Sequence, residues 1–492
     1  MRKFRASQSA PKRNQPTVLR ISYATKVFGL LIAIAVGIRL ISFFPSVIDH
    51  DESTYLVIAD ALTHGHTYQV DYVDTKPIGI FLLLAGLHPL LGHDVFSYRL
   101  VAALVLGLTA FFLFRAKRID GSPRQAALAS SIIYLVLNSV YTRYGVSPNT
   151  ETYFNLFTAL ALIVFLRYRS IGAYLLTGLL LGIGFVIKYV VLFDGLALGA
   201  FLIFQALRRE GNVVMALSRA LIMAAAAALP FGLVLSYYYQ IGEFDDFWFH
   251  SITVAGRYPS GRGFVHYVSF FFEFFLRYLP VTALYILALR SRSVSLTTRQ
   301  LGAIWSIFTL VAVLLPGNAF GHYYIQFMLP FSYLAGEFFS IPKAEVPKWM
   351  QWMRSTRIGY PLLGLLFLAH LALQKKDYLD RPDNVQRAAD FLNERLEPGD
   401  QIYTQEDQAI YFLTDRLPLI PYVHPSLFWM DKHIAAMEID VEQEVTKIKA
   451  AAPRFMVFRY PVEADRFAKY RAAYYRRLKN VGDYVVIFER QD

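Results

Sequence analysis

The stretch DHDESTYLVIADALTHGHTYQVDYVDTKPIG, residues 49–79, holds the side chains best suited to chemistry. Asp51 and Glu52 are adjacent carboxylates just after the first apolar run, and Lys76 precedes Pro77 where another apolar run begins. A carboxylate can take a proton from a hydroxyl nucleophile. A lysine whose stem packs on acyl chains can reach a lipid phosphate. Acidic outer loops and snorkelling lysines are also common without function, so spacing alone leaves both interpretations open.

Two further charged residues lie at the ends of apolar runs. Glu151 follows SPNT at the outer end of a predicted helix, where capping and the helix dipole alone would favour a carboxylate. Lys188 separates two apolar half-runs, and an unpaired lysine at mid-membrane costs roughly 2.5–3.5 kcal/mol. Lys188 therefore lies at a tight turn near the outer interface or has an anionic partner in a cavity. A plain salt bridge to Asp194 is the structural alternative.

Later polar residues add weaker signals. His322 and Tyr323 begin a predicted helix after PGNAFG, where a histidine can bind phosphate, a metal or a backbone carbonyl. The segment 241–266, rich in glycine and aromatic residues, is typical of a mobile loop that covers a substrate. Arginines in such a loop are candidate phosphate or carboxylate clamps. The candidate substrate-contacting residues of this loop are Arg257, Arg262 and His266.

The composition predicts that a membrane-embedded helical bundle positions these residues. Of the 492 residues, 55% are hydrophobic and 17% are charged, whereas soluble proteins carry about 25% charged residues. The apolar blocks approach the roughly 20 residues needed to cross a bilayer, and they do not alternate as the strands of a membrane barrel do. The chain has no cysteine, which excludes disulfides, thiolate metal sites and thiol nucleophiles.

Basic connectors set the predicted topology. They share one side of the membrane only if the apolar stretch 77–92 is a juxtamembrane or re-entrant helix, and the positive-inside rule places that side in the cytoplasm. The net charge of +12 then reflects topology and does not indicate nucleic-acid binding. We predict about eleven spans, with the N-terminus in the cytoplasm. The spans are 27–47, 97–115, 125–142, 152–167, 172–188, 190–207, 214–240, 267–289, 300–316, 322–341 and 357–374.

The predicted fold is a polytopic all-α membrane bundle followed by a small soluble α/β domain outside the membrane. Its parts are a basic cytoplasmic tail (1–26), a transmembrane domain (27–374) with a catalytic first outer loop (48–96), and the extracytoplasmic domain (375–492). The last part alternates helical and strand-like signals. It has no glycine-rich phosphate loop and no nucleophile elbow. We expect it to act as a lid or an acceptor-docking unit.

Within that last part, a helix is predicted at DNVQRAADFLNERL, with further helices near 440–451 and 463–479. Strands are predicted at QIYTQ, FMVFR and YVVIFER.

The ordered motifs resemble the type C glycosyltransferases, specifically the branch with the protein O-mannosyltransferases and the lipid A aminoarabinose transferase. Two departures from the aminoarabinose branch are Thr75, where that branch has a carboxylate before Lys-Pro, and Glu151, where it has Asp. Asp74 lies one residue before Thr75. The matching residues are Asp51, Glu52, Tyr55, Gly65, Lys76, Pro77, Ile78, Asn149, Thr150, Glu151, Gly182, Gly184, Lys188, His322, Tyr323 and Pro330.

The resemblance implies transfer of one sugar from a polyprenyl-phosphate donor to an acceptor on the outer leaflet, with inversion at the anomeric carbon. It implies that Asp51 is the general base or its organiser, that the adjacent Glu52 is also catalytic, and that Glu151 is the second acidic residue. Lys76 and Lys188 would hold the donor phosphate, with His322 and Tyr323 assisting. The acceptor, which is a lipid, a glycan or a protein, stays open.

We assign no metal ligands and no certain cofactor, and a need for a divalent cation, Mg²⁺ or Mn²⁺, also stays open. We expect a monomer surrounded by lipid in the inner (plasma) membrane of a bacterium.

Three other functions fit parts of the pattern. A lipid-linked oligosaccharide ligase or polymerase would rely on outer-loop Arg and His residues and would tolerate Asp51→Asn. A transporter or flippase would place charges along a path through mid-bilayer and often shows an internal repeat, whereas these charges cluster on one predicted face. A binding or scaffolding function would not explain why Lys188 lies between two apolar runs.

Overall fold

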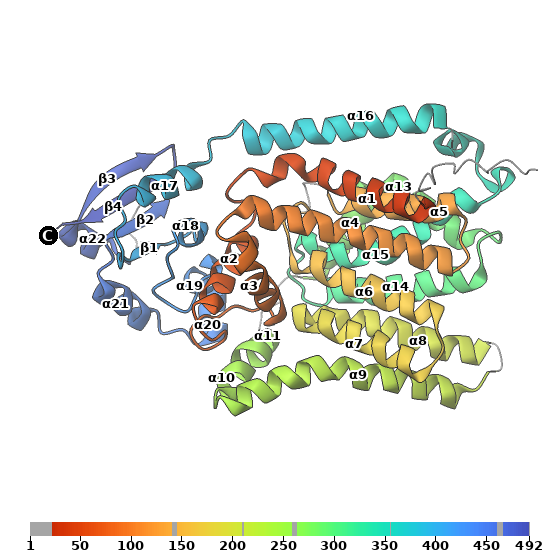
Figure 1. The fold of residues 1–492 in the computed structure, drawn as a ribbon, viewed down its shortest axis with the longest axis horizontal. Coiled ribbons are helices and arrows are strands. Elements are labelled where there is room, and N and C mark those ends of the chain that lie inside the picture. The colour runs from red at the N-terminus through yellow and green to blue at the C-terminus, as the bar shows by residue number, and fades with distance from the viewer. Residues whose placement is uncertain are drawn as a thin grey trace, which may run out of the picture.

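The computed structural model describes residues 22–139, 145–208, 211–257, 263–354, 356–459 and 466–491. Figure 1 shows apolar helices packed side by side as a bundle, with a sheet-containing C-terminal region beyond one end of it. Most of the predicted tail 1–26 and the candidate residue Arg262 lie outside the described residues.

Five of the described helices are long and apolar enough to cross a membrane, and a bent pair is a sixth candidate. An apolar helical membrane bundle is therefore confirmed. The count of eleven spans stays a prediction, because several apolar helices are too short to cross about 30 Å at 1.5 Å per residue. The five are α1 (Tyr23–Arg39) with its extension η1 (Leu40–Phe43), α4 (Val95–Ile119), α8 (Leu192–Arg208) with the preceding turn η3 (Tyr189–Val191), α9 (Val213–Gln240) and α14 (Leu296–Leu314).

Other helices complete the bundle, and all but α16 are shorter than the five long ones. They are α5 (Arg124–Leu137), α6 (Thr150–Arg167), α7 (Ile171–Ile187), α15 (Tyr324–Ala335) and α16 (Thr356–Gln374). In Figure 1, α16 runs along the bundle and leads the chain to the C-terminal region.

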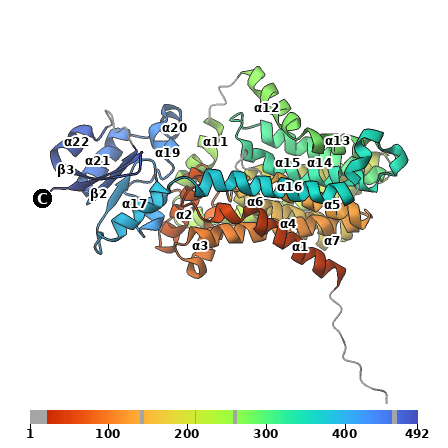
Figure 2. The same ribbon diagram turned by 90° about the horizontal axis from the view of Figure 1, so that it is seen from above.

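The span predicted at 267–289 is not one straight helix, and whether its two halves cross the membrane together stays a prediction. The chain there forms α12 (Phe264–Arg277) and α13 (Leu279–Arg290), which are bent by 88° at the break between them. Tyr278 leaves the helical conformation, with φ −103° and ψ 33°. Pro280 at the start of α13 has no N–H to continue the earlier helix. Figure 2 shows α12 projecting away from the bundle.

Two short helices lie between the bundle and the C-terminal region (Figure 1), α2 (His50–Thr63) and α3 (Gly79–Leu91). This place agrees with the juxtamembrane position predicted for 77–92. Gly79 lies so close to the backbone of Val186 and Ile187, at the end of α7, that a Cβ atom would clash there. The glycine thus lets the start of α3 approach the end of α7.

The C-terminal region holds a four-stranded sheet in the order β1-β2-β4-β3. β1 runs parallel to β2, and the other neighbouring strands are antiparallel. Its elements are α17 (Asn384–Asn393), β1 (Ile402–Thr404), α18 (Ala409–Leu413), α19 (Pro425–Trp429), α20 (Asp431–Met437), α21 (Val441–Ala451), β2 (Phe455–Arg459), α22 (Ala468–Tyr474), β3 (Tyr475–Val481) and β4 (Val485–Arg490).

The three predicted strands of this region are confirmed, as are the helices at DNVQRAADFLNERL and near 440–451. The helix predicted near 463–479 begins outside the described residues and ends at Tyr474 with α22, because residues 475–481 form β3. This segment is an edge strand that pairs with β4. Its exposed charges protect this sheet edge against further pairing.

The C-terminal region docks on α2 and on the loop that follows it. Gln408 donates hydrogen bonds to the backbone oxygen of His50 at 3.0 Å and to Thr54 Oγ1 at 3.1 Å. The backbone N–H of Val73 donates to the carbonyl of Pro421 at 2.9 Å. These contacts bring side chains of the C-terminal region to the end of the bundle where α2 lies.

Candidate active site

Two lysine–carboxylate pairs form the centre of the candidate site. Lys76 Nζ lies 2.6 Å from Asp51 Oδ1 at the start of α2 and 3.5 Å from Asp74 Oδ1. Lys188, which follows α7, contacts the carboxylate of Glu151 in the first turn of α6. Four residues predicted from the sequence therefore pair carboxylate with lysine at the same end of the bundle.

His322 connects the two pairs. It lies in the turn η5 (Gly321–Tyr323) before α15 and is buried. Its ring nitrogen and one carboxylate oxygen each of Asp49 and Asp51 all lie within 4.8 Å of one another. His322 also interacts electrostatically with Glu151, and Lys188 Nζ lies 4.8 Å from the centre of the Tyr323 ring. The predicted histidine and tyrosine thus belong to the same cluster.

Lys188 has its anionic partner in Glu151, so the alternative partner Asp194 is wrong. Asp194 accepts hydrogen bonds from Trp305 Nε1 at 2.6 Å and Gln326 Nε2 at 2.7 Å, inside the bundle. A lysine paired with a buried carboxylate does not bear the full cost of an isolated charge in a membrane.

The charge state of the acidic residues near α2 follows from their neighbours. Burial alone would raise the pKa of Asp51, but the charge and hydrogen bond of Lys76, together with the nearby His424 and His322, outweigh burial and hold that pKa below its usual value. Burial and the negative charge of Asp51 raise the pKa of Asp49 to about 7. Asp51 is therefore ionised at neutral pH, whereas Asp49 titrates in that range.

Glu52 points away from this cluster, although it is adjacent to Asp51 in the sequence. Neighbouring residues of a helix are about 100° apart around its axis. Glu52 is 3% exposed and accepts two hydrogen bonds from Arg99 of α4, at 2.6 and 2.8 Å. The structure therefore places Glu52, a predicted catalytic residue, in a buried ion pair between α2 and α4.

The candidate substrate loop does not supply a second cluster of cations in the described residues. Arg257, at the end of α11 (Val254–Arg257), forms an ion pair with Glu438 of the C-terminal region at 2.5 Å and is 44% exposed. His266 lies in the first turn of α12, and its ring centre is 6.5 Å from that of Tyr267.

Comparison with known proteins shows which folds this structure resembles. Residues 75–233 match the family described as dolichyl-phosphate-mannose-protein mannosyltransferase, and no curated protein sequence matches the chain. The structure is similar to ArnT from Cupriavidus metallidurans bound to undecaprenyl phosphate, with a TM-score of 0.66, 16% identity and coverage of 94% of this chain and 98% of that chain. The apo structure of the same protein gives a TM-score of 0.64, with 16% identity, 95% of this chain and 98% of that chain.

This chain has the type C glycosyltransferase fold. The resemblance inferred from the ordered motifs is therefore confirmed. A more distant structure, the Archaeoglobus fulgidus oligosaccharyltransferase in its apo form, has a TM-score of 0.51 and 12% identity, covering 90% of this chain and 70% of that chain.

The loop that carries Lys76 in this glycosyltransferase fold shows how the lysine keeps an acidic neighbour without a carboxylate at position 75. Thr75 replaces the carboxylate that directly precedes Lys-Pro in the aminoarabinose branch, but Asp74 takes part in holding the lysine. The Asp74 carboxylate accepts the backbone N–H of Lys76 at 3.1 Å and lies near its ammonium group. One residue of offset in a loop therefore still places an acidic group beside the lysine.

The sequence did not identify His424, which the glycosyltransferase fold brings from the C-terminal region to within 3.5 Å (Nε2) of Asp51 Oδ1. His424 Nδ1 accepts the backbone N–H of Ser426 at 3.2 Å at the start of α19. Burial lowers the pKa of His424 to about 4, although Asp51 opposes this. A neutral ring with an accepting Nδ1 carries its proton on Nε2, the nitrogen that faces Asp51. The only local signal was His-Pro-Ser, which is typical of a helix start.

Proposed function

We propose that this chain moves a single sugar from a polyprenyl-phosphate donor to an acceptor hydroxyl or phosphate on the outer face of the membrane, with inversion at the anomeric carbon. One observation carries the proposal: an ionised carboxylate, Asp51, and two lysines, Lys76 and Lys188, gather at one end of an apolar bundle. At that place a lipid phosphate and a water-borne acceptor can meet. The similarity to a structure that binds undecaprenyl phosphate supports this class of donor.

The proposed reaction is a direct displacement. Asp51 takes the proton from the acceptor hydroxyl as the acceptor oxygen bonds to the anomeric carbon, and the bond from that carbon to the phosphate oxygen breaks. The leaving phosphate keeps the bonding electrons and gains negative charge. Lys76 and Lys188 therefore bind the transition state more strongly than the donor, which is the condition for catalysis. His424 Nε2 faces Asp51 Oδ1 at 3.5 Å, and we assign it the role of orienting this carboxylate once the two groups close to hydrogen-bonding distance in the substrate complex.

A divalent cation has one set of ligands of suitable type in this cluster, namely Asp49, Asp51 and His322. Mg²⁺ or Mn²⁺ bound there would neutralise the donor phosphate. The ammonium group of Lys76 already contacts Asp51 Oδ1 at 2.6 Å, so the cation would have to displace it. We therefore assign the neutralisation of the phosphate to the lysines.

Lipid mass spectrometry tests the proposed function. Polyprenyl-phosphate monosaccharides are compared between cells with the intact protein and cells with Asp51→Asn. We expect a sugar-loaded carrier to accumulate in the variant, and its mass identifies the sugar. An unchanged pool would contradict a monosaccharide on a monophosphate carrier as donor.

Lys76→Ala is expected to weaken donor binding by about tenfold or more, because a hydrogen bond to a charged group contributes about 1.5–3 kcal/mol. Binding of a polyprenyl-phosphate sugar to the purified protein measures the effect. Lys447→Ala, at an exposed lysine that pairs with Glu444 in the C-terminal region, is the matched control. Unchanged donor affinity in Lys76→Ala would mean that this lysine only anchors its loop.

Donor affinity is expected to fall by a few-fold as the pH rises through about 7. Asp49, whose pKa burial and Asp51 raise to about 7, is neutral below that pH and negative above it. The donor phosphodiester keeps one negative charge throughout, so ionised Asp49 repels it. Binding titrations between pH 6 and 8, a window set by that pKa, should show a slope in the wild type and none in Asp49→Asn. An identical slope in both proteins would exclude Asp49 as its source.

A further inference from the structure

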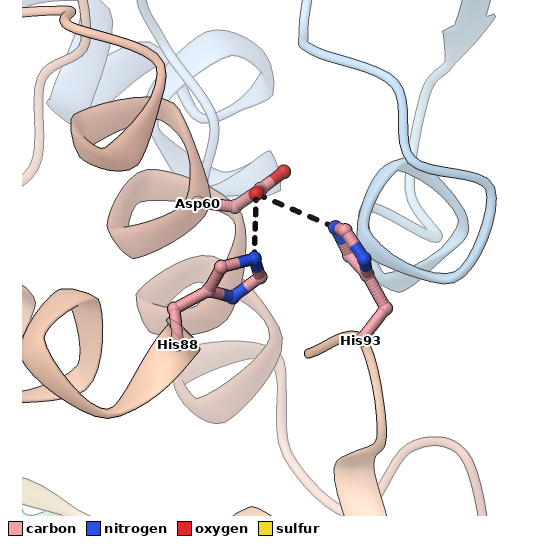
Figure 3. Close-up of side chains that lie close together, drawn as sticks. All are labelled: Asp60, His88 and His93. Atoms are coloured by element: carbon pink, nitrogen blue, oxygen red, sulfur yellow. Dashed lines mark ion pairs between the residues drawn. The ribbon is translucent and has the colours of Figure 1, made fainter. Parts of the chain in front are cut away.

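A second cluster of polar side chains lies on α2, away from the candidate active site. Asp60 follows Asp51 by nine residues, which places it about 14 Å further along the helix and on the opposite face. Figure 3 shows the rings of His88, from the end of α3, and His93, from the loop before α4, converging on one carboxylate oxygen of Asp60. None of these three residues takes part in the proposed sugar transfer.

The distances in this cluster are too long for good hydrogen bonds. The Nε2 atoms of His88 and His93 each lie 3.4 Å from Asp60 Oδ1, whereas N–H···O bonds measure about 2.7–3.2 Å. Asp60 is 1% exposed. In the part of the chain that the structure describes, neither Asp60 Oδ1 nor His93 Nε2 has a hydrogen-bond partner. Buried polar atoms without partners are costly and rare in native proteins.

The same distances suit a metal ion. A tetrahedral zinc ion with bonds of about 2.0–2.1 Å holds neighbouring ligand atoms about 3.3–3.4 Å apart. Two imidazole nitrogens and one carboxylate oxygen are typical zinc ligands, whereas calcium and magnesium prefer oxygen ligands only. His88 is also oriented as zinc ligands are, because its Nδ1 is 3.1 Å from the hydroxyl of Tyr98 and its Nε2 faces the cluster.

A fourth ligand is available in the C-terminal region. Asp415 Oδ1 lies 3.5 Å from His93 Nε2, just after α18, and Phe412 of α18 packs on the His93 ring at 4.9 Å between ring centres. His64 Nδ1 is 3.6 Å from Asp60 Oδ1, but this nitrogen is already hydrogen-bonded to the backbone oxygen of Asp60 at 3.0 Å. Asp415 is therefore the better fourth ligand, but its carboxylate lies within 4.8 Å of the ligand atoms of Asp60 and His64 and not of the whole group Asp60, His88 and His93, so it has to move toward His88 to complete the site.

We propose that Asp60, His88, His93 and Asp415 bind one zinc ion, and that this ion fastens the C-terminal region to α2 and α3. Asp60 and Asp51 belong to the same helix, and His424 belongs to the region that the ion would hold. The zinc site would thus fix the position of His424 relative to Asp51 without touching the substrates.

The metal content of the full-length purified protein tests this site. The protein is stripped with a chelator, given zinc, dialysed and assayed by plasma mass spectrometry. We expect one zinc per chain in the wild type, in Asp51→Asn and in His66→Gln, a matched histidine outside the cluster. We expect its loss in His88→Gln and in His93→Gln. A wild type without zinc would overturn the proposal, as would zinc that persists in both variants or disappears only in Asp51→Asn.

Two further measurements test the zinc site without relying on the folding of His88→Gln and His93→Gln. Tyr98→Phe, which keeps every ligand, should lower zinc affinity about 10–100-fold. Cobalt added to the stripped wild type should give the visible absorption of a four-coordinate ion with nitrogen and oxygen ligands. An unchanged affinity in Tyr98→Phe, or cobalt absorption typical of an ion surrounded by six waters, would contradict this site.

Discussion

Asp51→Asn is expected to reduce sugar transfer by about 10²–10⁴-fold, the usual contribution of a general base. An amide has nearly the size of the carboxylate but cannot take a proton from the acceptor. Asp51 is ionised in the resting protein, since Lys76 holds its pKa below the usual value, so the group that is lost is the active form. Transfer to acceptor by the purified protein measures the loss.

The fold of Asp51→Asn should stay intact. Asp51 lies in the first turn of α2, partly exposed, and the capping residue of this helix is Asp49. Lys76 keeps a second carboxylate nearby in Asp74, so the variant does not leave an isolated lysine. We therefore expect a fall in kcat with a smaller change in KM and a similar thermal midpoint.

Asp71→Asn is the matched control for this prediction, because Asp71 is an exposed carboxylate in the same segment. It should transfer sugar at the wild-type rate. Full activity in Asp51→Asn would contradict the role of Asp51 and favour a ligase or a transporter, neither of which needs a base at this position.

The end of the bundle at which the site residues lie was predictable from the sequence. Asp51, Lys76, Glu151 and Lys188 all flank apolar runs, so a topology that collects the basic loops on one side gathers these four at the other side. Their partners were less predictable. Lys188 is much nearer in sequence to Asp194 than to Glu151, and only the packing of α6 on α7 decides that Glu151 and not Asp194 faces it.

Two kinds of feature escaped the sequence. His424 reaches Asp51 through the docking of the C-terminal region, which depends on contacts such as that of Gln408 with the backbone of α2, and such contacts leave no periodic signal. The second half of the helix predicted near 463–479 is a strand because its backbone pairs with β4. Tertiary pairing of this kind overrides local helix propensity.

The roles of adjacent Asp51 and Glu52 differ because their side chains point in different directions from α2. Both were predicted to be catalytic from the same pattern. Glu52 instead pairs with Arg99 by accepting its hydrogen bonds. The guanidinium of Arg99 also donates to the carbonyl of Ser42 at 3.0 Å. This network joins the end of α1, the start of α2 and the start of α4, so it determines how α2 sits on the bundle.

Arg99→Met is therefore expected to destabilise the protein by about 3–5 kcal/mol, because it leaves Glu52 charged, buried and without its partner. The double variant Arg99→Met/Glu52→Gln should recover much of this loss, since a buried pair replaced as a whole costs far less than half of a pair. Thermal unfolding in detergent measures both. Arg381→Met, which removes an exposed ion pair with Asp377, should cost at most about 1 kcal/mol. A different outcome would be an Arg99→Met variant that is as stable as Arg381→Met but has lost sugar transfer. Glu52 and Arg99 would then act on the substrates, and the division of roles between Asp51 and Glu52 would be wrong.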